Sequence, residues 1–108
     1  MKKGEIWLVE LPQNISKEQA GNRPAVLIAE VDAGMAIIVP ITSNIQALKF
    51  KNTLTVSPSK ANGLQQTSVA LAFQLRAIDG KRLIKKQGNL EDKTLKEIQS
   101  MIKSMLKL

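Results

Sequence analysis

The chain has 108 residues, of which 44% are hydrophobic, and it carries a formal net charge of +7. A chain of this length forms one domain and buries roughly 60 to 70% of the surface that its unfolded state exposes. It contains no cysteine and no histidine, which excludes disulfides, thiolate zinc sites and the usual acid–base group at neutral pH.

The positive charge is compatible with a nucleic-acid partner, and equally with a basic surface that serves only solubility. The chain has no run of about 18 apolar residues that would predict a membrane helix. Its N-terminus reaches Glu5 before a signal-peptide core could form. We therefore expect a cytoplasmic protein.

Most of the chain predicts short strands. The predicted strands are residues 5–11, 25–31, 35–42, 53–57, 68–72 and 75–79. Turn signals lie between them at Asp32–Gly34 and at Asp79–Gly80. Strands at a spacing of about ten residues predict a small barrel or a strongly bent sheet, here over residues 4–88.

The C-terminal segment changes period and predicts one amphipathic helix over residues 91–107, packed on the barrel. Acidic residues lie near its start and lysines near its end, as the helix dipole favours. The apolar residues that recur at intervals of three and four are Leu95, Ile98, Met101, Ile102, Met105 and Leu106. The chain is thus expected to be a single domain, residues 1–108.

Arg23 is the first candidate for chemistry, because it follows a polar, glycine-containing stretch and precedes Pro24 and a predicted strand. A guanidinium stays charged and offers a planar fork of donors to phosphate oxygens, and proline fixes the backbone behind it. The alternative is a surface ion pair with Glu18. Thr42 and Ser43 end the strand "IIVPITS", where their hydroxyls would bind phosphate or orient a 2′-OH, or serve only as turn residues.

Several segments together resemble the MazF/PemK/Kid family of toxins, and they span nearly the whole chain. They are "KGEIWLVEL", "SKEQAGNRPAVLI", "IIVPITS", "NGL" with a following serine, "QLRAIDGKRL" and "GNL". The resemblance implies a mainly β fold, an SH3-like barrel with C-terminal helical structure. It also implies a homodimer, metal-independent and sequence-specific cleavage of single-stranded RNA without a cofactor, and an antitoxin of the MazE/PemI type that blocks the RNA groove.

In this family the arginine of the first loop works with the threonine of the "PxTS" motif, which implies Arg23 and Thr42 as catalytic residues. Glu18 is the only carboxylate of the loop motif and is expected to act as a base or to orient Arg23, unless it is merely solvated. Gly21 is expected to supply a backbone conformation. The residues expected to bind RNA are Ser16, Gln19, Asn22, Ser43, Gln74, Arg76 and Lys81.

The chain departs from the family's pattern just before Gln74. Some members have an acidic residue at the position of Phe73, and a subset uses an arginine at the position of Leu71, so an arginine–aspartate mechanism is excluded here. We expect Phe73 in the core, with stacking on a base as the alternative. Arg76 either contacts phosphate or pairs with Asp79, and the structural role is favoured.

Two functions from different classes remain. The first is an endoribonuclease toxin that cleaves mRNA. The second is a non-catalytic barrel that binds nucleic acid or poisons a protein target, as the related CcdB-type toxins act on DNA gyrase. Trp7 is expected in the core or in a dimer interface rather than as a stacking platform.

Overall fold

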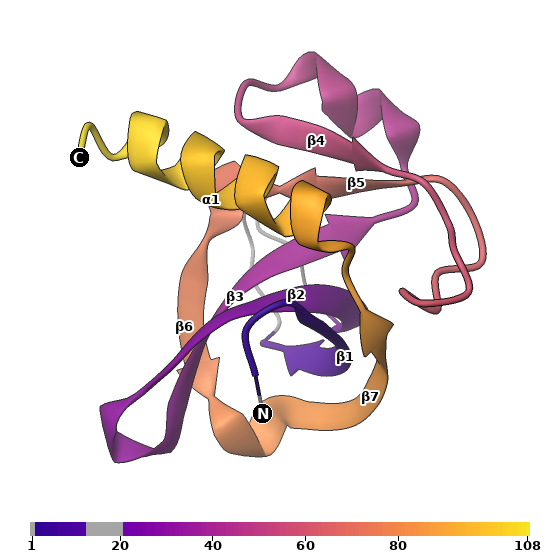
Figure 1. Cartoon of the computed structure of the whole chain (residues 1–108). Helices are drawn as coiled ribbons and strands as arrows, with labels where there is room; N and C mark the ends of the chain where they lie inside the picture. Colours follow the sequence, from indigo (N-terminus) through magenta and orange to yellow (C-terminus); the bar gives the residue numbers. More distant parts are fainter. Residues whose placement is uncertain (1, 13–20) are drawn as a thin grey trace.

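The computed structural model describes residues 2–12 and 21–108, and it shows a strongly curved antiparallel sheet with one helix lying across it (Figure 1). The strands are β1 (Glu5–Leu11), β2 (Gly21–Val31), β3 (Met35–Thr42), β4 (Thr53–Val56), β5 (Ser68–Leu71), β6 (Arg76–Asp79) and β7 (Leu83–Asn89). The helix α1 is Asp92–Met105, and short 3-10 turns are η1 (Asp32–Gly34), η2 (Ile45–Lys49), η3 (Ala72–Gln74) and η4 (Gly80–Arg82). No helix in the described ranges is long and apolar enough to cross a membrane.

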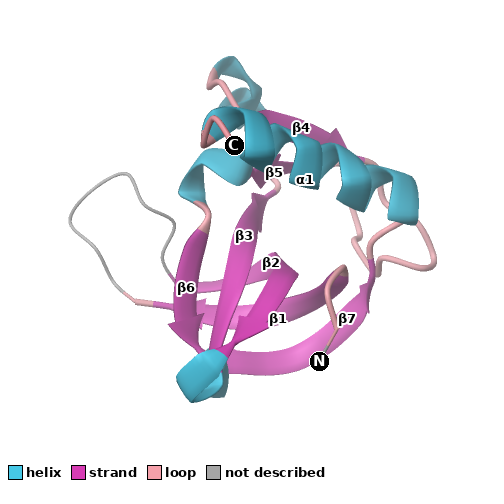
Figure 2. Cartoon of the chain, turned by 60° about the vertical axis from the view of Figure 1, so that its left-hand side comes forward, coloured by secondary structure: helices cyan, strands magenta, loops and turns pink. Residues whose placement is uncertain are grey.

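The strand β3 organises the sheet because it changes partner along its length. The strand order is β4-β5-β3-β2-β1-β7, and β6 pairs with β3 off this path. The first half of β3, Met35–Ile38, pairs with β6, whereas Ile41 and Thr42 pair with β5. The described pairs run from β4 to β7 without a ladder that joins these two strands, so the sheet curls without closing (Figure 2).

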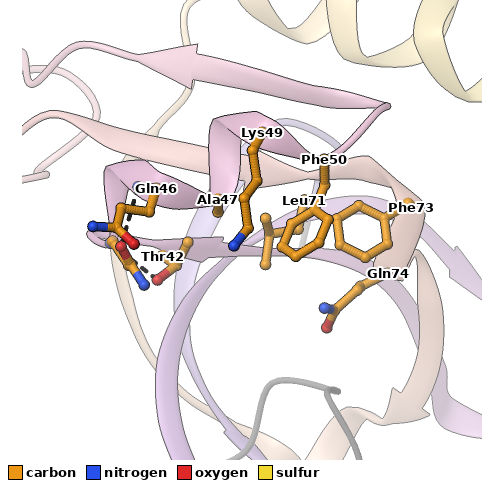
Figure 3. A pocket seen from close by; sticks show the side chains of 9 residues that line it. Thr42, Gln46, Ala47, Lys49, Phe50, Leu71, Phe73 and Gln74 are labelled. Carbon is orange, nitrogen blue, oxygen red and sulfur yellow. Dashed lines mark hydrogen bonds between the residues drawn. The ribbon is translucent and has the colours of Figure 1, made fainter.

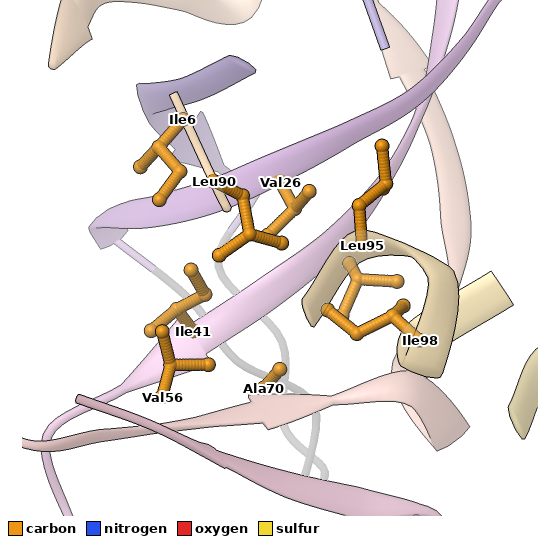
Figure 4. Close-up of a cluster of buried hydrophobic side chains, with 9 residues drawn as sticks. Ile6, Val26, Ile41, Val56, Ala70, Leu90, Leu95 and Ile98 are labelled. Carbon is orange, nitrogen blue, oxygen red and sulfur yellow. The ribbon is translucent and has the colours of Figure 1, made fainter. Parts of the chain in front are cut away.

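The helix α1 covers the core where the sheet stays open. Its buried residues Leu95 and Ile98 join a hydrophobic cluster with side chains from five strands (Figure 4). The other buried members of this cluster are Ile6, Val26, Val39, Ile41, Val56, Ala70 and Leu90. The mainly β class with a C-terminal helix is confirmed, and α1 occupies Asp92–Met105 within the predicted 91–107.

A second cluster takes the residues that alternate with the first along β2 and β3. Ala25 and Leu27 belong to it, whereas Val26 between them belongs to the first. The full buried set is Val9, Leu11, Ala25, Leu27, Ala36, Ile38 and Ile78, with Trp7 half-buried against it. Both faces of these strands are therefore covered, which explains why their sequences are continuous apolar runs instead of alternating ones.

Two strand predictions were wrong. β2 begins at Gly21 and not at residue 25, so Arg23 lies inside the strand, opposite Val9. β7 was missed because its sequence, LIKKQGN, is polar and charged, as is typical of an edge strand. It pairs only with β1 among the described strands.

Glu5 ties the start of β1 to β7. Its carboxylate accepts hydrogen bonds from the backbone N of Lys2 (2.9 Å) and Nε1 of Trp7 (3.1 Å), and Nζ of Lys86 lies at 3.0 Å. These contacts, that from Lys2 foremost, lower the pKa of Glu5 from its ordinary 4.5 to about 2, although burial opposes the shift. The half-buried Trp7 thus satisfies its indole N–H within the same network.

Candidate functional site

Two pockets open at the end of β3, and the last two residues of that strand, Ile41 and Thr42, line one each. Successive side chains of a strand point to opposite faces, so Ile41 and Thr42 point apart. We call the first the Thr42 pocket; it is lined by Thr42, Asn44, Gln46, Ala47, Lys49, Phe50, Leu71, Phe73 and Gln74. We call the second the Arg23 pocket; it is lined by Asn22, Arg23, Pro24, Ile41, Ser43, Gly63, Leu64, Gln65, Gln66, Ser68 and Gln87.

The hydroxyl of Thr42 is held by the chain that follows it. Thr42 is buried, with only 6% of its surface exposed, and its Oγ1 accepts a hydrogen bond of 3.2 Å from the backbone N of Asn44 (Figure 3). The Asn44 side chain in turn accepts from the backbone N of Gln46 at 3.1 Å and caps η2. Because one lone pair of the Thr42 oxygen is occupied by this N–H, its own hydrogen remains to donate toward a ligand.

Arg23 is exposed and lies near Thr42 in the strand register. Ala25 pairs with Pro40 and Val26 with Val39. The pairs between β2 and β3 end there, two residues short of Arg23 on β2 and two residues short of Thr42 on β3, and the two side chains line different pockets. Strand pairing with Val9 on the other side fixes the backbone of Arg23 more firmly than a loop position would.

Some of the predicted site residues lie outside the described residues, namely Ser16, Glu18 and Gln19. Gly21, which follows them, has φ +81 with nothing near its Cβ position. This left-handed conformation confirms that Gly21 supplies a backbone geometry that other residues adopt only with strain. Asn22, the next residue, is exposed and lines the Arg23 pocket.

Some of the other predicted RNA-binding residues lie near Thr42 or Arg23, and others lie far from both. Gln74 shares the pocket of Thr42, and Ser43 shares that of Arg23. Arg76 pairs with Ile38, four residues back along β3. Lys81 follows Asp79, which pairs with Met35, and therefore lies about 20 Å from Thr42 at the opposite end of β3. The carboxylate of Asp79 accepts from the backbone N of Lys81 at 2.9 Å and so caps η4.

The prediction that Phe73 is a core residue was wrong. Its 3-10 turn follows β5 directly and breaks the alternation of the strand, which leaves the side chain 40% exposed. Phe50 is 45% exposed beside it, and the two ring centroids are 5.6 Å apart with the planes tilted by 53° (Figure 3). Nζ of Lys49 lies 5.3 Å from the Phe50 ring centroid.

The sequence indicates that residues 44–52 carry RNA specificity, but it does not single out Phe50, Lys49 or the amides of η2 within them. The structure brings these side chains to the Thr42 pocket. Such a segment does not show which residues face a pocket, because η2 has no long period from which a face could be read.

A buried polar cluster supports the far wall of the Arg23 pocket. Asn62 is fully buried; its Oδ1 accepts from the backbone N of Ser59 and of Leu64, both at 3.0 Å, and its Nδ2 donates to the Ser57 carbonyl at 2.9 Å. Nδ2 also lies 3.3 Å from Oε1 of Glu91, the residue that precedes α1.

Glu91 completes this cluster. The Ser59 hydroxyl donates to its Oε2 and, against the effect of burial, holds the pKa of Glu91 below its ordinary value. Gly63, with φ +69, lets the same segment approach β7 so closely that a Cβ would lie 2.2 Å from the Gln87 carbonyl oxygen. The segment from Ser57 to Leu64 is therefore fixed to both β7 and the start of α1.

Side chains that could hold a metal ion do not gather in the part of the chain that the structure describes: no group of three His, Cys, Asp or Glu residues is found there. What the two pockets offer instead is one guanidinium, one ammonium, hydroxyls and amides. These groups stabilise negative charge and read hydrogen-bonding edges, as a site for a polyanion with bases requires.

Comparison with known proteins identifies the family. The family model for the "PemK-like, MazF-like toxin of type II toxin-antitoxin system" matches residues 2–106. The chain belongs to this family. It is 31% identical over 113 residues to "Endoribonuclease EndoA" of Bacillus subtilis (strain 168), which covers 100% of this chain and 96% of that protein. It is 34% identical over 107 residues to "Endoribonuclease MazF" of Staphylococcus saprophyticus, covering 94% and 88%.

Solved structures of the family share the fold. A crystal structure of MazF from Deinococcus radiodurans superimposes with a TM-score of 0.82 at 22% identity, covering 100% of this chain and 97% of that one. A MazE-MazF structure from the same organism gives a TM-score of 0.70 at 24% identity, covering 98% and 94%. The sequence resemblance to this toxin family is thus confirmed.

Proposed function

We propose that this toxin is a metal-independent endoribonuclease that cleaves single-stranded RNA, mRNA included, at a specific sequence. The family relatives named endoribonucleases support the activity. The observation that carries the proposal is that the end of β3 lies between two pockets, one lined by Arg23 and the other by Thr42. An RNA strand that spans both pockets would meet a cation in one and a hydroxyl in the other.

In the proposed reaction the 2′-oxygen of a ribose attacks the adjacent phosphorus, and the bond from phosphorus to the 5′-oxygen breaks. The products are a 2′,3′-cyclic phosphate and a 5′-hydroxyl; the proton lost by the 2′-OH goes to a base, and the leaving oxygen gains one. Arg23 stabilises the charge that develops on the phosphorane oxygens. Thr42 is too weak a base to take the proton and instead donates its hydrogen bond to position the reacting groups.

Glu18 remains our proposal for the base or for the group that orients Arg23. Asn22 and Ser43 are proposed to bind RNA beside Arg23, and Gln74 beside Thr42. Ser16 and Gln19 belong to the same proposal through the motif that contains Glu18. Arg76 and the distant Lys81 would contact phosphates only of a longer RNA that runs along β3 and β6.

The partners follow from the same family. Structures described as MazE-MazF and as an endoribonuclease with its cognate antitoxin support an antitoxin of the MazE/PemI type for this chain. We propose that it binds over the RNA pockets, that the toxin is a homodimer, and that it acts in the cytoplasm.

The decisive experiment is incubation of the purified toxin with a long single-stranded RNA in EDTA, followed by sequencing of the ends. We expect cuts at a short motif, with 2′,3′-cyclic phosphate or 3′-phosphate ends. Arg23→Ala should lower the rate about 10²- to 10³-fold, as loss of a group that stabilises transition-state charge does. Lys96→Ala is the control, because Lys96 is an exposed cation on α1 that pairs with Asp92 at 3.2 Å and lines neither pocket.

Absence of cleavage on diverse RNA, or undiminished cleavage by folded Arg23→Ala, would refute the proposal. Absence of cleavage with retained binding would favour the non-catalytic barrel. The departures from the family's pattern at Leu71 and Phe73 are the features that favour this second function.

A further inference from the structure

The two phenylalanines of the chain are both exposed, and they lie together at the mouth of the Thr42 pocket. The chain has one Trp, no Tyr and two Phe, so most of its aromatic residues lie on this one surface. Phe50 and Phe73 are 45% and 40% exposed and belong to η2-β4 and η3, segments about twenty residues apart in sequence. Two large apolar side chains brought together at the surface indicate a ligand more than a folding requirement.

The geometry of the pair suits a flat ligand. The ring centroids are 5.6 Å apart and the ring planes are tilted by 53°, and both side chains stay partly exposed while lining the pocket. The pocket holds a volume of about 150 Å³, which is of the order of one nucleobase. Figure 3 shows the rings and Gln74 on one side of it and Thr42 on the other.

The polar lining favours a base attached to a phosphate. Amides at Asn44, Gln46 and Gln74 line the pocket, and amides read the edges of unpaired bases. Lys49 is the single charged residue that the described part of the chain contributes to the lining, and its Nζ lies 5.3 Å from the Phe50 ring centroid. Among the described residues the lining contains no carboxylate that would repel a polyanion.

We propose that Phe50 and Phe73 form a stacking shelf for one unpaired base of the RNA, the base next to the bond that is cleaved, with Lys49 on the adjoining phosphate. The position of this base follows from Thr42, which lines the same pocket. In the proposed reaction Thr42 acts at the scissile phosphate. The inference rests on the proposed function and extends it. It assigns sequence specificity on this side of the cut to η2 and η3, through a pair of aromatic residues and not through a carboxylate at position 73.

The test measures binding apart from cleavage. A fluorescein-labelled 15-nucleotide single-stranded pool of random sequence with 2′-deoxyribose throughout cannot be cleaved, so its Kd is defined for every variant. Phe50→Leu with Phe73→Leu keeps apolar bulk but removes both rings. Stacking contributes about 1–3 kcal/mol per base, so we expect Kd to rise at least about fivefold. Ile84→Ala is the matched control, because Ile84 is a 51% exposed apolar residue on β7 outside the pocket.

Two further readouts separate stacking from a general loss of affinity. A 2-aminopurine placed at each position of a 2′-deoxy-substituted strand should be quenched by the wild type at one position and not by the double variant. Lys49→Met should reduce the slope of log Kd against log salt by about 0.7, the value for one phosphate, while leaving the quenching in place.

The outcomes are distinguishable from failure of the proposed function, which is read from cleavage of natural RNA. A Kd within twofold of wild type in the double variant, or quenching at no position, overturns the shelf even if the enzyme is active. A loss of antitoxin binding without a loss of oligonucleotide binding also overturns it and assigns the rings to a protein partner.

Discussion

Replacing Asn62 by alanine should destabilise the toxin severely, although Asn62 is polar and lies in a loop. Its side chain makes four hydrogen bonds: two accepted from backbone N–H groups at 3.0 Å, one donated to a carbonyl at 2.9 Å and one to Glu91 at 3.3 Å. The residue has no exposed surface, so the variant leaves these partners buried and without their hydrogen bonds.

The magnitude follows from the groups left behind. A buried polar group without a partner costs about 1–3 kcal/mol, and water entering the vacated space will satisfy some of the partners, so we expect a net loss of about 3 kcal/mol. For a domain of this size each 1 kcal/mol lowers Tm by about 4–8 °C, so the transition should fall by about 12–24 °C. The Arg23 pocket should suffer as well, because the segment that Asn62 holds forms one of its walls.

Urea denaturation followed by fluorescence of Trp7, the single tryptophan, measures this loss directly. Asn89→Ala is the matched control, because Asn89 is exposed and its backbone N makes the hydrogen bond of 2.8 Å to Ala61. We expect the control within about 0.5 kcal/mol of wild type. A loss below about 1 kcal/mol in Asn62→Ala would refute the reasoning that this cluster fixes the loop.

Three other variants test separate parts of the structure. Glu5→Gln should lower the free energy of unfolding by about 2 kcal/mol at pH 7, because folding depresses the pKa of Glu5 from 4.5 to about 2. In a series of urea titrations at different pH, the difference between wild type and variant should persist above pH 4.5 and vanish as pH falls to 2. Equal losses at pH 2 and pH 7 would contradict it. Gly63→Ala should cost about 2–4 kcal/mol because its Cβ would meet the Gln87 carbonyl oxygen at 2.2 Å, whereas Gly34→Ala, with open space and φ +72, should cost about 1–2 kcal/mol, as thermal unfolding will show. Thr42→Val should lower kcat for RNA cleavage at unchanged fold and Thr42→Ser should restore it, since only the hydroxyl is at issue; equal rates in the two variants would remove Thr42 from the mechanism.

The sequence predicts this fold where burial dictates the pattern. β2 and β3 lie between two hydrophobic clusters, so their apolar runs were visible, and the 3.6-residue period of α1 was equally clear. β7 was missed because it lies at an edge and carries lysines, and the N-terminal extension of β2 was missed because residues 21–24 are polar or proline. Strand pairing with Val9, which the local sequence does not show, makes Arg23 part of a strand.

The sequence motifs predicted several residues of the candidate site, but not which of them share a pocket. Alternation along β3 divides Ile41 and Thr42 between two pockets, a consequence of strand geometry that the motif itself does not reveal. The exposure of Phe73 depends on the 3-10 turn that follows β5, and its meeting with Phe50 depends on how η2 and η3 pack. The distance of Lys81 follows from the pairing of β6 with β3.

The placement of Arg23 within a paired strand has a consequence for how such toxins diversify. Since the register with β1 fixes Arg23 opposite Val9, its backbone position depends on the ladder and not on the length or composition of the segment that joins the two strands. Changes in residues 13–20 that keep Glu18 are therefore expected to alter which RNA is chosen while the backbone of Arg23 stays in place. A lineage of such proteins would change its targets quickly and its chemistry slowly, and transplanting that segment between relatives that share this carboxylate should transfer sequence preference.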